Sequence, residues 1–527
     1  MLRARRSAQV AAPRYVTLPI RPIGGQRDYD PSREIPAEVS PDMSNCLVRD
    51  GCLYRRPGFV QFKSGNSAIG TTVVGLYSTQ DEENNTHLFA AHETGLAKFN
   101  TLTEVWDACT GPALTGSSIL PMSFETSQNS VVFSQGADQV MRIPFSGTTY
   151  ALLNADCPAA RYLDRFGDRL VLGFTLESGI SKPFRVRWPQ NSDHTKWTGT
   201  GSGFRDASEW PYHLKGIRKL GTQLAVYYEH AIELASRTEM IPPFRFDVRA
   251  ADIGLYAPAT LQGRNDVHFF LGNDDFYAFD GVQVRSIGQP IRDSVFAELN
   301  ASLLPIMFGE ILLDTQEYLA FLCTGASSYP NKVWVYNWGR NVWYPWTVDG
   351  PRCSAIHRLD DTMTIDELVG TIDEQAWIFD SRIIQAAYPA FLTGNANGKI
   401  YQWSTAYTSD NGVAIPCKWT SKDFRSQDFG APAGQEITIR RIAVHHRGTG
   451  SAAFLDVSFS PDGGSNWYGP YTVTLVNAVG GWHVSVLDHM FTGKQLRFKV
   501  EHSSTTSTFI ISSFDVTFEL RGMLEKE

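Results

Sequence analysis

Charged residues are scarce in this chain of 527 residues, at 19% of the sequence against roughly 25% in an average soluble domain. Two explanations stay open. Much of the surface is buried against other chains, or the chain is simply a Thr-, Ser- and Gly-rich all-β protein. The charge balance is mildly negative, with 47 basic and 55 acidic residues. That sign argues against a surface that wraps DNA or binds an anionic membrane.

Cysteine pairs and long apolar runs are also lacking. The seven cysteines are an odd number without a CxxC pair, which predicts reduced, mostly buried thiols of a protein folded in a cytoplasm. The Arg-rich N-terminus, MLRARRSAQVAAPR, is not followed by the apolar stretch of a signal peptide, and no run has the length of a membrane-spanning helix. Helical spacing occurs at Pro290–Leu304 alone, which predicts one short inserted helix.

What the chain does have is a recurring hairpin. Residues 267–284, VHFFLGNDDFYAFDGVQV, predict a strand, a tight turn, a second strand and a Gly-marked exit. The same outline recurs at residues 88–99, 131–143, 224–234 and 391–403. Over most of this span the copies start roughly 40 to 55 residues apart, as expected for four-stranded propeller blades.

The strands in this region are apolar on both faces. In residues 333–338, VWVYNW, and residues 267–271, VHFFL, bulky side chains occupy both sets of alternating positions. Such strands must be covered on both sides, and blades stacked around an axis provide that cover. The sequence therefore predicts an all-β protein with a β-propeller.

The two ends of the chain differ from its middle. Six prolines between Pro13 and Pro41 break any regular element near the N-terminus, whereas the alternation in residues 496–501 and 514–520 predicts strands with one buried face. We therefore expect an extended N-terminal arm with an entry strand at 1–60, a propeller at 61–412 and a C-terminal β-sandwich at 413–527. The blade count stays open, because the gap between 318–346 and 391–403 holds an insertion or a missed blade.

Several acidic motifs are candidate sites. Ser460–Trp467, SPDGGSNW, fits the Asp-box of sialidases and other propellers, but a single copy favours a structural turn. Three carboxylate pairs could serve glycoside hydrolysis, although each falls near a predicted turn: Asp274-Asp275, Asp360-Asp361 and Asp373-Glu374. The turn at 273–275 is interpreted as a solvated loop tip. With Asp280 it could hold Ca²⁺, but it lacks the bidentate Glu and the spacing of an EF-hand.

Two further motifs are candidates for metal or carbohydrate binding. His445 and His446 point to opposite faces of a strand and do not chelate together easily. The aromatic residues of 334–346 could stack on carbohydrate, but their spacing favours a hairpin whose rings pack between blades. Common nucleotide-binding, hydrolase and zinc-protease motifs are absent from the sequence. We therefore predict no enzyme, and assign no catalytic, cofactor-binding or metal-binding residue and no cofactor.

The order of several segments carries a resemblance. The run Asp42–Gly51, DMSNCLVRDG, leads to Arg56-Pro57-Gly58, and residues 253–258, 267–281 and 287–291 follow. Together they resemble the β-propeller tail nozzle proteins, also called tail hub or tail accessory proteins, of short-tailed bacteriophages. The resemblance implies a structural protein of the virion tail, made in the host cytoplasm, with no catalytic residues.

The family also implies partners. They are other copies in a homohexameric ring, a tail adaptor, tail fibres or a plug, and DNA that passes transiently and without specificity during ejection. No membrane insertion is expected. Two alternatives stay open: a tail receptor-binding protein that contacts host surface glycans, and a glycan-active propeller hydrolase.

Overall fold

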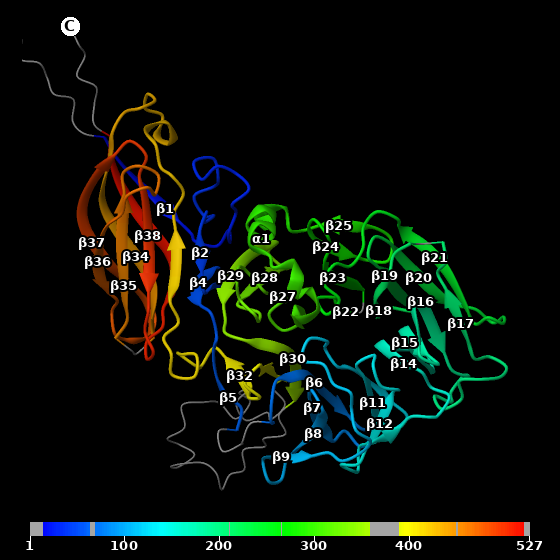
Figure 1. The fold of residues 1–527 in the computed structure, drawn as a ribbon. Coiled ribbons are helices and arrows are strands. Elements are labelled where there is room, and N and C mark those ends of the chain that lie inside the picture. The colour runs from blue at the N-terminus through cyan, green and yellow to red at the C-terminus, as the bar shows by residue number, and fades with distance from the viewer. Residues whose placement is uncertain are drawn as a thin grey trace, which may run out of the picture. The chain divides into compact units, whose positions relative to one another are not determined.

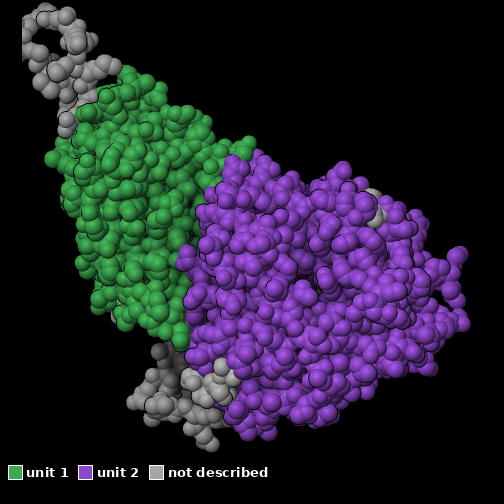
Figure 2. All heavy atoms as spheres, viewed as in Figure 1, with its two compact units in different colours: residues 1–58, 341–346, 408–527 green, residues 59–340, 347–407 purple. Residues whose placement is uncertain are grey.

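Antiparallel strands make up most of the chain in the computed structural model, which describes residues 14–63, 69–209, 211–264, 266–358, 389–449 and 452–520. The chain divides into two compact units (Figure 2). Unit 1 comprises residues 1–58, 341–346 and 408–527, and unit 2 comprises residues 59–340 and 347–407. None of the described helices is both long and apolar enough to cross a membrane.

Seven four-stranded antiparallel sheets form a ring of propeller blades (Figure 1). The first three blades are β6 (Val73–Gln80), β7 (Thr86–His92), β8 (Gly95–Asn100) and β9 (Val105–Ala108); β10 (Ser123–Ser127), β11 (Ser130–Ser134), β12 (Met141–Pro144) and β13 (Ala151–Leu152); and β14 (Ala159–Phe166), β15 (Arg169–Glu177), β16 (Ile180–Trp188) and β17 (Gly203–Asp206). Within each of these blades, strands adjacent in sequence are adjacent in the sheet.

The next three blades follow the same order. They are β18 (Leu214–Leu220), β19 (Gln223–Tyr228), β20 (Ile232–Arg237) and β21 (Phe244–Ala250); β22 (Gln262–Arg264), β23 (Val267–Leu271), β24 (Phe276–Phe279) and β25 (Val284–Ser286); and β26 (Phe308–Leu312), β27 (Glu317–Leu322), β28 (Lys332–Asn337) and β29 (Val342–Thr347). The propeller fold expected from the sequence is therefore confirmed.

The seventh blade closes the ring with strands from both ends of the propeller sequence. Its order is β30 (Pro351–Arg358), β31 (Pro389–Asn395), β32 (Ile400–Ser404) and β5 (Gly58–Gln61). The ring of Phe59 in β5 packs against Tyr401 and Trp403, with centroids 5.1 and 4.9 Å apart. Because β5 precedes the first blade in sequence, this pairing joins the start of the ring to its end.

Aromatic side chains fill the spaces between blades. Phe166 and Trp188 of the third blade contact Phe244 of the fourth, with ring centroids 5.3 and 5.1 Å apart. Phe269 of the fifth blade stacks on Tyr318 of the sixth at 5.6 Å. Burying a side chain of this size stabilises the fold by about 1.5–3 kcal/mol. The expected burial of both strand faces is thus confirmed.

The five expected hairpins coincide with the two middle strands of five blades. The middle strands of the sixth blade, β27 and β28, fall in the repeat expected at 318–346, and the middle hairpin of the third blade was missed. The third blade has β15–β16, and β16 reads ISKPFRVRW, with Lys, Pro and Arg where the other blades are apolar. The long gap before residue 391 falls within the seventh blade. It separates β30 from its partner β31, and residues 359–388 lie outside the described part.

The expected inserted helix is present but short. The helix α1 (Arg292–Glu298) lies between the 3₁₀ helices η1 (Gln289–Ile291) and η2 (Ala301–Ile306). Leu299 leaves helical geometry at ψ 126°, so the predicted span of 290–304 is divided.

Unit 1 contains two antiparallel sheets. The first, here called the long sheet, contains β1 (Arg14–Ile20), β3 (Cys46–Arg49), β4 (Cys52–Arg55), β34 (Ile437–Thr449), β37 (Val479–Gly493) and β39 (Ile510–Leu520). The second contains β2 (Met43–Ser44), β33 (Cys417–Thr420), β35 (Phe454–Ser460), β36 (Tyr468–Thr474) and β38 (Arg497–His502). Contacts such as Trp419 to Phe514, at 5.4 Å, join the two sheets.

The N-terminal region contributes to both of these sheets. The predicted arm of residues 1–60 contains β1, β3 and β4, which join the long sheet, and β2, which joins the second sheet. The predicted boundaries divided the chain by sequence position. Unit 1 instead combines segments from both ends of the sequence.

Candidate functional site

The first strand of every blade lines a central channel in unit 2. The channel is a cavity of about 970 Å³. Each blade contributes a polar side chain to its wall, and these are Ser78, Glu125, Asp164, Arg218, Gln262, Glu310 and Ser354.

Glu125 and Asp164 face each other from neighbouring blades. Burial, followed by the charge of Asp164, raises the pKa of Glu125 to about 7. Burial also raises the pKa of Asp164 to about 6, although Arg218 opposes the shift. Each carboxylate accepts backbone N–H groups, from Thr126 at 2.9 Å and from Lys219 at 2.6 Å respectively. The two carboxyls therefore retain protons at a pH where exposed carboxyls have lost them.

Glu310 and Arg218 also line the channel, together with Arg161, Lys219 and Arg264. Glu310 accepts hydrogen bonds from the Ser354 hydroxyl and the Ile311 N–H, both at 3.0 Å, and burial raises its pKa. The Arg218 guanidinium donates to the Leu261 carbonyl at 3.3 Å and favours the ionised forms of all three carboxyls. The lining is thus of mixed sign, without a strong field of either charge.

The channel is narrow. A passage as long as a five-residue strand, about 17 Å, and about 12 Å across would have a volume of about 1,900 Å³, roughly twice that of this cavity. The major groove of DNA alone is about 12 Å wide. Water, ions and small molecules fit this channel, and a DNA duplex does not. Among the described residues, no three His, Cys, Asp or Glu side chains converge to hold a metal ion.

The Asp-box forms a tight turn between β35 and β36. Asp462 accepts hydrogen bonds from the Ser460 hydroxyl at 2.8 Å and from the Asn466 N–H at 2.9 Å. These bonds lower its pKa to about 2. Gly463 and Gly464 have φ of 71° and 97°, which side-chain-bearing residues rarely adopt. The interpretation as a structural turn is confirmed.

The interpretation of the 273–275 turn as a solvated loop tip is wrong for Asp275. Its side chain is buried, accepts a hydrogen bond from the Ser286 hydroxyl and lies 3.9 Å from the Arg292 guanidinium. Asn273 is also engaged, donating to the Glu229 carbonyl at 3.2 Å. The turn is held against neighbouring segments because Asp275 links it to β25 and α1. The sequence pattern could not reveal these partners.

The other weighed carboxylates and histidines form no common site in the described residues. Asp274 accepts a hydrogen bond from Tyr277 at 2.7 Å, and Asp280 pairs with Arg285. Asp360-Asp361 and Asp373-Glu374 lie outside the described residues. His445 is half-exposed beside Asp515, whereas His446 is buried beside Ser485, so the two point to opposite faces as expected.

The aromatic cluster is part of the core. Trp334 has no exposed surface, and Tyr336 is 6% exposed. Trp338 stacks on Phe269 of the neighbouring blade at 5.5 Å. Rings packed in this way offer no face to a sugar. The preferred interpretation, a hairpin packed between blades, is confirmed.

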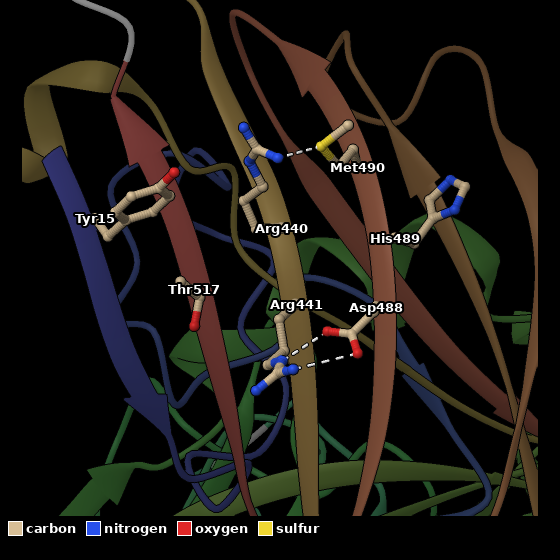
Figure 3. A pocket seen from close by; sticks show the side chains of 7 residues that line it. All are labelled: Tyr15, Arg440, Arg441, Asp488, His489, Met490 and Thr517. Atoms are coloured by element: carbon tan, nitrogen blue, oxygen red, sulfur yellow. Dashed lines mark hydrogen bonds and ion pairs between the residues drawn. The ribbon is translucent and has the colours of Figure 1, made fainter. Parts of the chain in front are cut away.

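A second hollow lies on the outer face of the long sheet in unit 1 (Figure 3). It is open, with a volume of about 660 Å³. Arg441 and Asp488 form a two-point ion pair across it, at 2.6 and 3.2 Å. Tyr15, at 56% exposure, borders it on β1, and Met490, at 61% exposure, borders it on β37.

The seven cysteines are free thiols, six of them buried. This agrees with the expectation of mostly buried thiols. Burial raises the pKa of Cys109 to about 11, which leaves its thiol protonated and unreactive at neutral pH.

No protein-family model and no curated protein matches this chain. Among solved structures, it is similar to the extracellular domain of a one-component system from B. thetaiotaomicron, at 11% identity and a TM-score of 0.38. That match covers 76% of this chain and 46% of the other, so this chain spans less than half the neighbour's length. It is also similar to the WD40 domain of Pan2 from Neurospora crassa, at 9% identity and a TM-score of 0.38, covering 68% of this chain and 97% of that domain.

Proposed function

We propose that this chain is a structural protein of the virion tail of a short-tailed phage. Several copies form the nozzle ring, which extends the DNA-ejection channel below the tail adaptor and anchors fibres or a plug. The role is mechanical, and no catalytic step is assigned to it.

The observation that carries the proposal is the order of the segments that resemble the family. Residues 42–51 fall on β2 and β3, and Arg56-Pro57-Gly58 leads into β5, the strand that closes the ring of blades. Residues 253–258 link the fourth blade to the fifth, and residues 267–281 are the middle hairpin of the fifth blade. The segments that resemble the family thus lie before the propeller, at the strand that closes its ring and in one of its blades.

The narrow propeller channel supports a multi-chain conduit. Because the cavity of about 970 Å³ is too small for a duplex, DNA would have to pass between copies rather than through one propeller. A mildly acidic chain suits such a conduit, since a surface with a net negative charge does not hold phosphates. The low charge content also fits surfaces that are buried between copies.

The assembly state tests this proposal. Light scattering of the purified full-length chain is expected to give a ring mass, which for six copies of 58.7 kDa is about 350 kDa. A stable single chain at all concentrations would overturn the proposal. A trimer would favour the receptor-binding alternative.

Exposed aromatic residues on unit 1 are the observation that favours that alternative. Tyr15 is 56% and Trp482 is 59% exposed, and both lie on strands of the long sheet. Exposed rings can stack on sugars. Specific binding of the purified chain to host cells, lost in Trp482→Ala, would support a receptor-binding role.

A further inference from the structure

The long sheet of unit 1 has two strands paired on one side only. β37 pairs with β34, and β1 pairs with β39, with no other partner in the described residues. Each therefore leaves a row of backbone N–H and C=O groups on its outer edge. Native proteins normally protect such edges, and an unprotected one is a site for pairing with another strand.

The outer face of this sheet is polar at its centre and apolar at its edges. On the central strands, the outward charges are paired: Arg440 with Glu519, and His445 with Asp515 at 2.9 Å. On the edge strand β37, apolar side chains point outward instead, and they are Trp482 at 59%, Val484 at 49%, Val486 at 45% and Met490 at 61% exposure. The opposite edge strand, β1, exposes Tyr15 (Figure 3).

The strand directions suit head-to-tail growth of the sheet. β1 is antiparallel to β39, β39 to β34, and β34 to β37. The two edge strands therefore run antiparallel to each other. A second copy placed beside the first in the same orientation would set its β1 antiparallel to β37, which is the arrangement that an added ladder needs.

The register of the sheet indicates which residues would meet. Thr17 pairs with Thr517, Thr517 with Arg441, and Arg441 with Asp488, so Thr17 and Asp488 lie on one level. A neighbour without a shift along the strands would place Thr17 against Asp488. Within one chain, bulges in β34 and β37 put Thr492 on the level of Tyr15. In an added ladder counted residue by residue from Thr17 and Asp488, Tyr15 would face Met490.

These pairs are chemically complementary. A threonine hydroxyl donates to a carboxylate, and a methionine sulfur packs well against an aromatic ring. Pro19 has no N–H, so the ladder would use the part of β1 that precedes it.

The geometry points to a contact between copies in which β37 of one chain pairs with β1 of the next. This inference rests on the proposed ring and names the surface that closes it. Such a contact uses different surfaces on the two partners, and contacts of that kind generate rings when the rotation closes. A pairing of β37 with β37 would instead give two-fold dimers.

Single and paired substitutions test this contact in the full-length chain. Tyr15→Lys and Met490→Lys, each alone, are expected to reduce the mass from the ring towards the single chain of 58.7 kDa. Tyr15→Lys combined with Met490→Glu is expected to restore the ring, because the lysine of one copy then faces the glutamate of the next. Val282→Lys, at a position 79% exposed in the fifth blade, is the matched control and should leave the ring intact.

The possible outcomes are distinct. A ring that persists in both single variants overturns the β37–β1 contact and leaves the proposed function standing. Loss of assembly in Met490→Lys alone, with no effect of Tyr15→Lys, overturns it in favour of β37–β37 pairing. A wild-type chain that never assembles overturns the proposed function as well.

Disulfide cross-linking between two introduced cysteines gives a second measurement, which does not require the contact between copies to be broken. In Tyr15→Cys with Met490→Cys, a mild disulfide oxidant should produce a ladder of covalent multimers, since facing residues lie within disulfide reach. Dimers from Met490→Cys alone would contradict the inference.

Discussion

Glu125 and Asp164 are the residues of the channel whose protonation is most altered by the fold. Both carboxyls have raised pKa values, to about 7 and about 6, mainly because of burial. A raised pKa means that the folded chain holds a proton which the unfolded chain has already released. These groups therefore reduce stability as the pH rises from about 4 to about 7.

Glu125→Gln replaces one of these ionisable carboxyls with an amide that stays neutral at every pH. The variant is expected to be more stable than the wild type at pH 8, by at most about 3 kcal/mol, and to match it at pH 4. Urea unfolding at the two pH values measures the difference. Glu82→Gln, on an exposed turn of the first blade, is the control and should change neither value. An equal effect of Glu125→Gln at both pH values would contradict the raised pKa.

Substitution of Trp334 tests whether the aromatic cluster is packed in the core or forms a platform for carbohydrate. Because its side chain is fully buried, Trp334→Ala is expected to reduce stability by about 3–5 kcal/mol. Tyr15→Ala, at an exposed ring, should cost far less. Chemical unfolding of the two variants is the measurement. A stable Trp334→Ala chain that had lost glycan binding would contradict the packed arrangement.

At the scale of the element, β5 is the strand that joins the ends of the propeller. Phe59→Ala removes the ring that packs on Tyr401 and Trp403, and is expected to reduce the stability of unit 2 by about 1–3 kcal/mol. Val248→Ala, at a half-exposed position of β21, is the control. Limited proteolysis should show earlier cleavage of the Phe59→Ala propeller. Unchanged cleavage would indicate that closure depends on the backbone ladder alone.

The elements also show which features a sequence can reveal. The blade hairpins were predictable because apolar residues on both strand faces and polar turns are local signals. The hairpin β15–β16 was missed because Lys and Pro interrupt its second strand. The channel carboxylates were not recognised, since Glu125, Asp164 and Glu310 meet only after the blades form a ring. Asp275 was misjudged for a similar reason, because its partner Arg292 comes from a helix beyond the hairpin.

At the scale of the whole molecule, the proposed function requires several copies of the chain to assemble. The propeller has a channel too narrow for DNA, and the long sheet leaves two antiparallel edge strands available. A ring of copies would explain both the narrow channel and the unpaired strand edges. The conduit would lie between chains, and the edge strands would join them.

Electron microscopy of the purified full-length chain tests this central claim most directly. The account predicts closed rings with an axial opening wider than a DNA duplex, surrounded by copies of the propeller. Single chains of 58.7 kDa, or closed assemblies without an axial opening of that width, would contradict it.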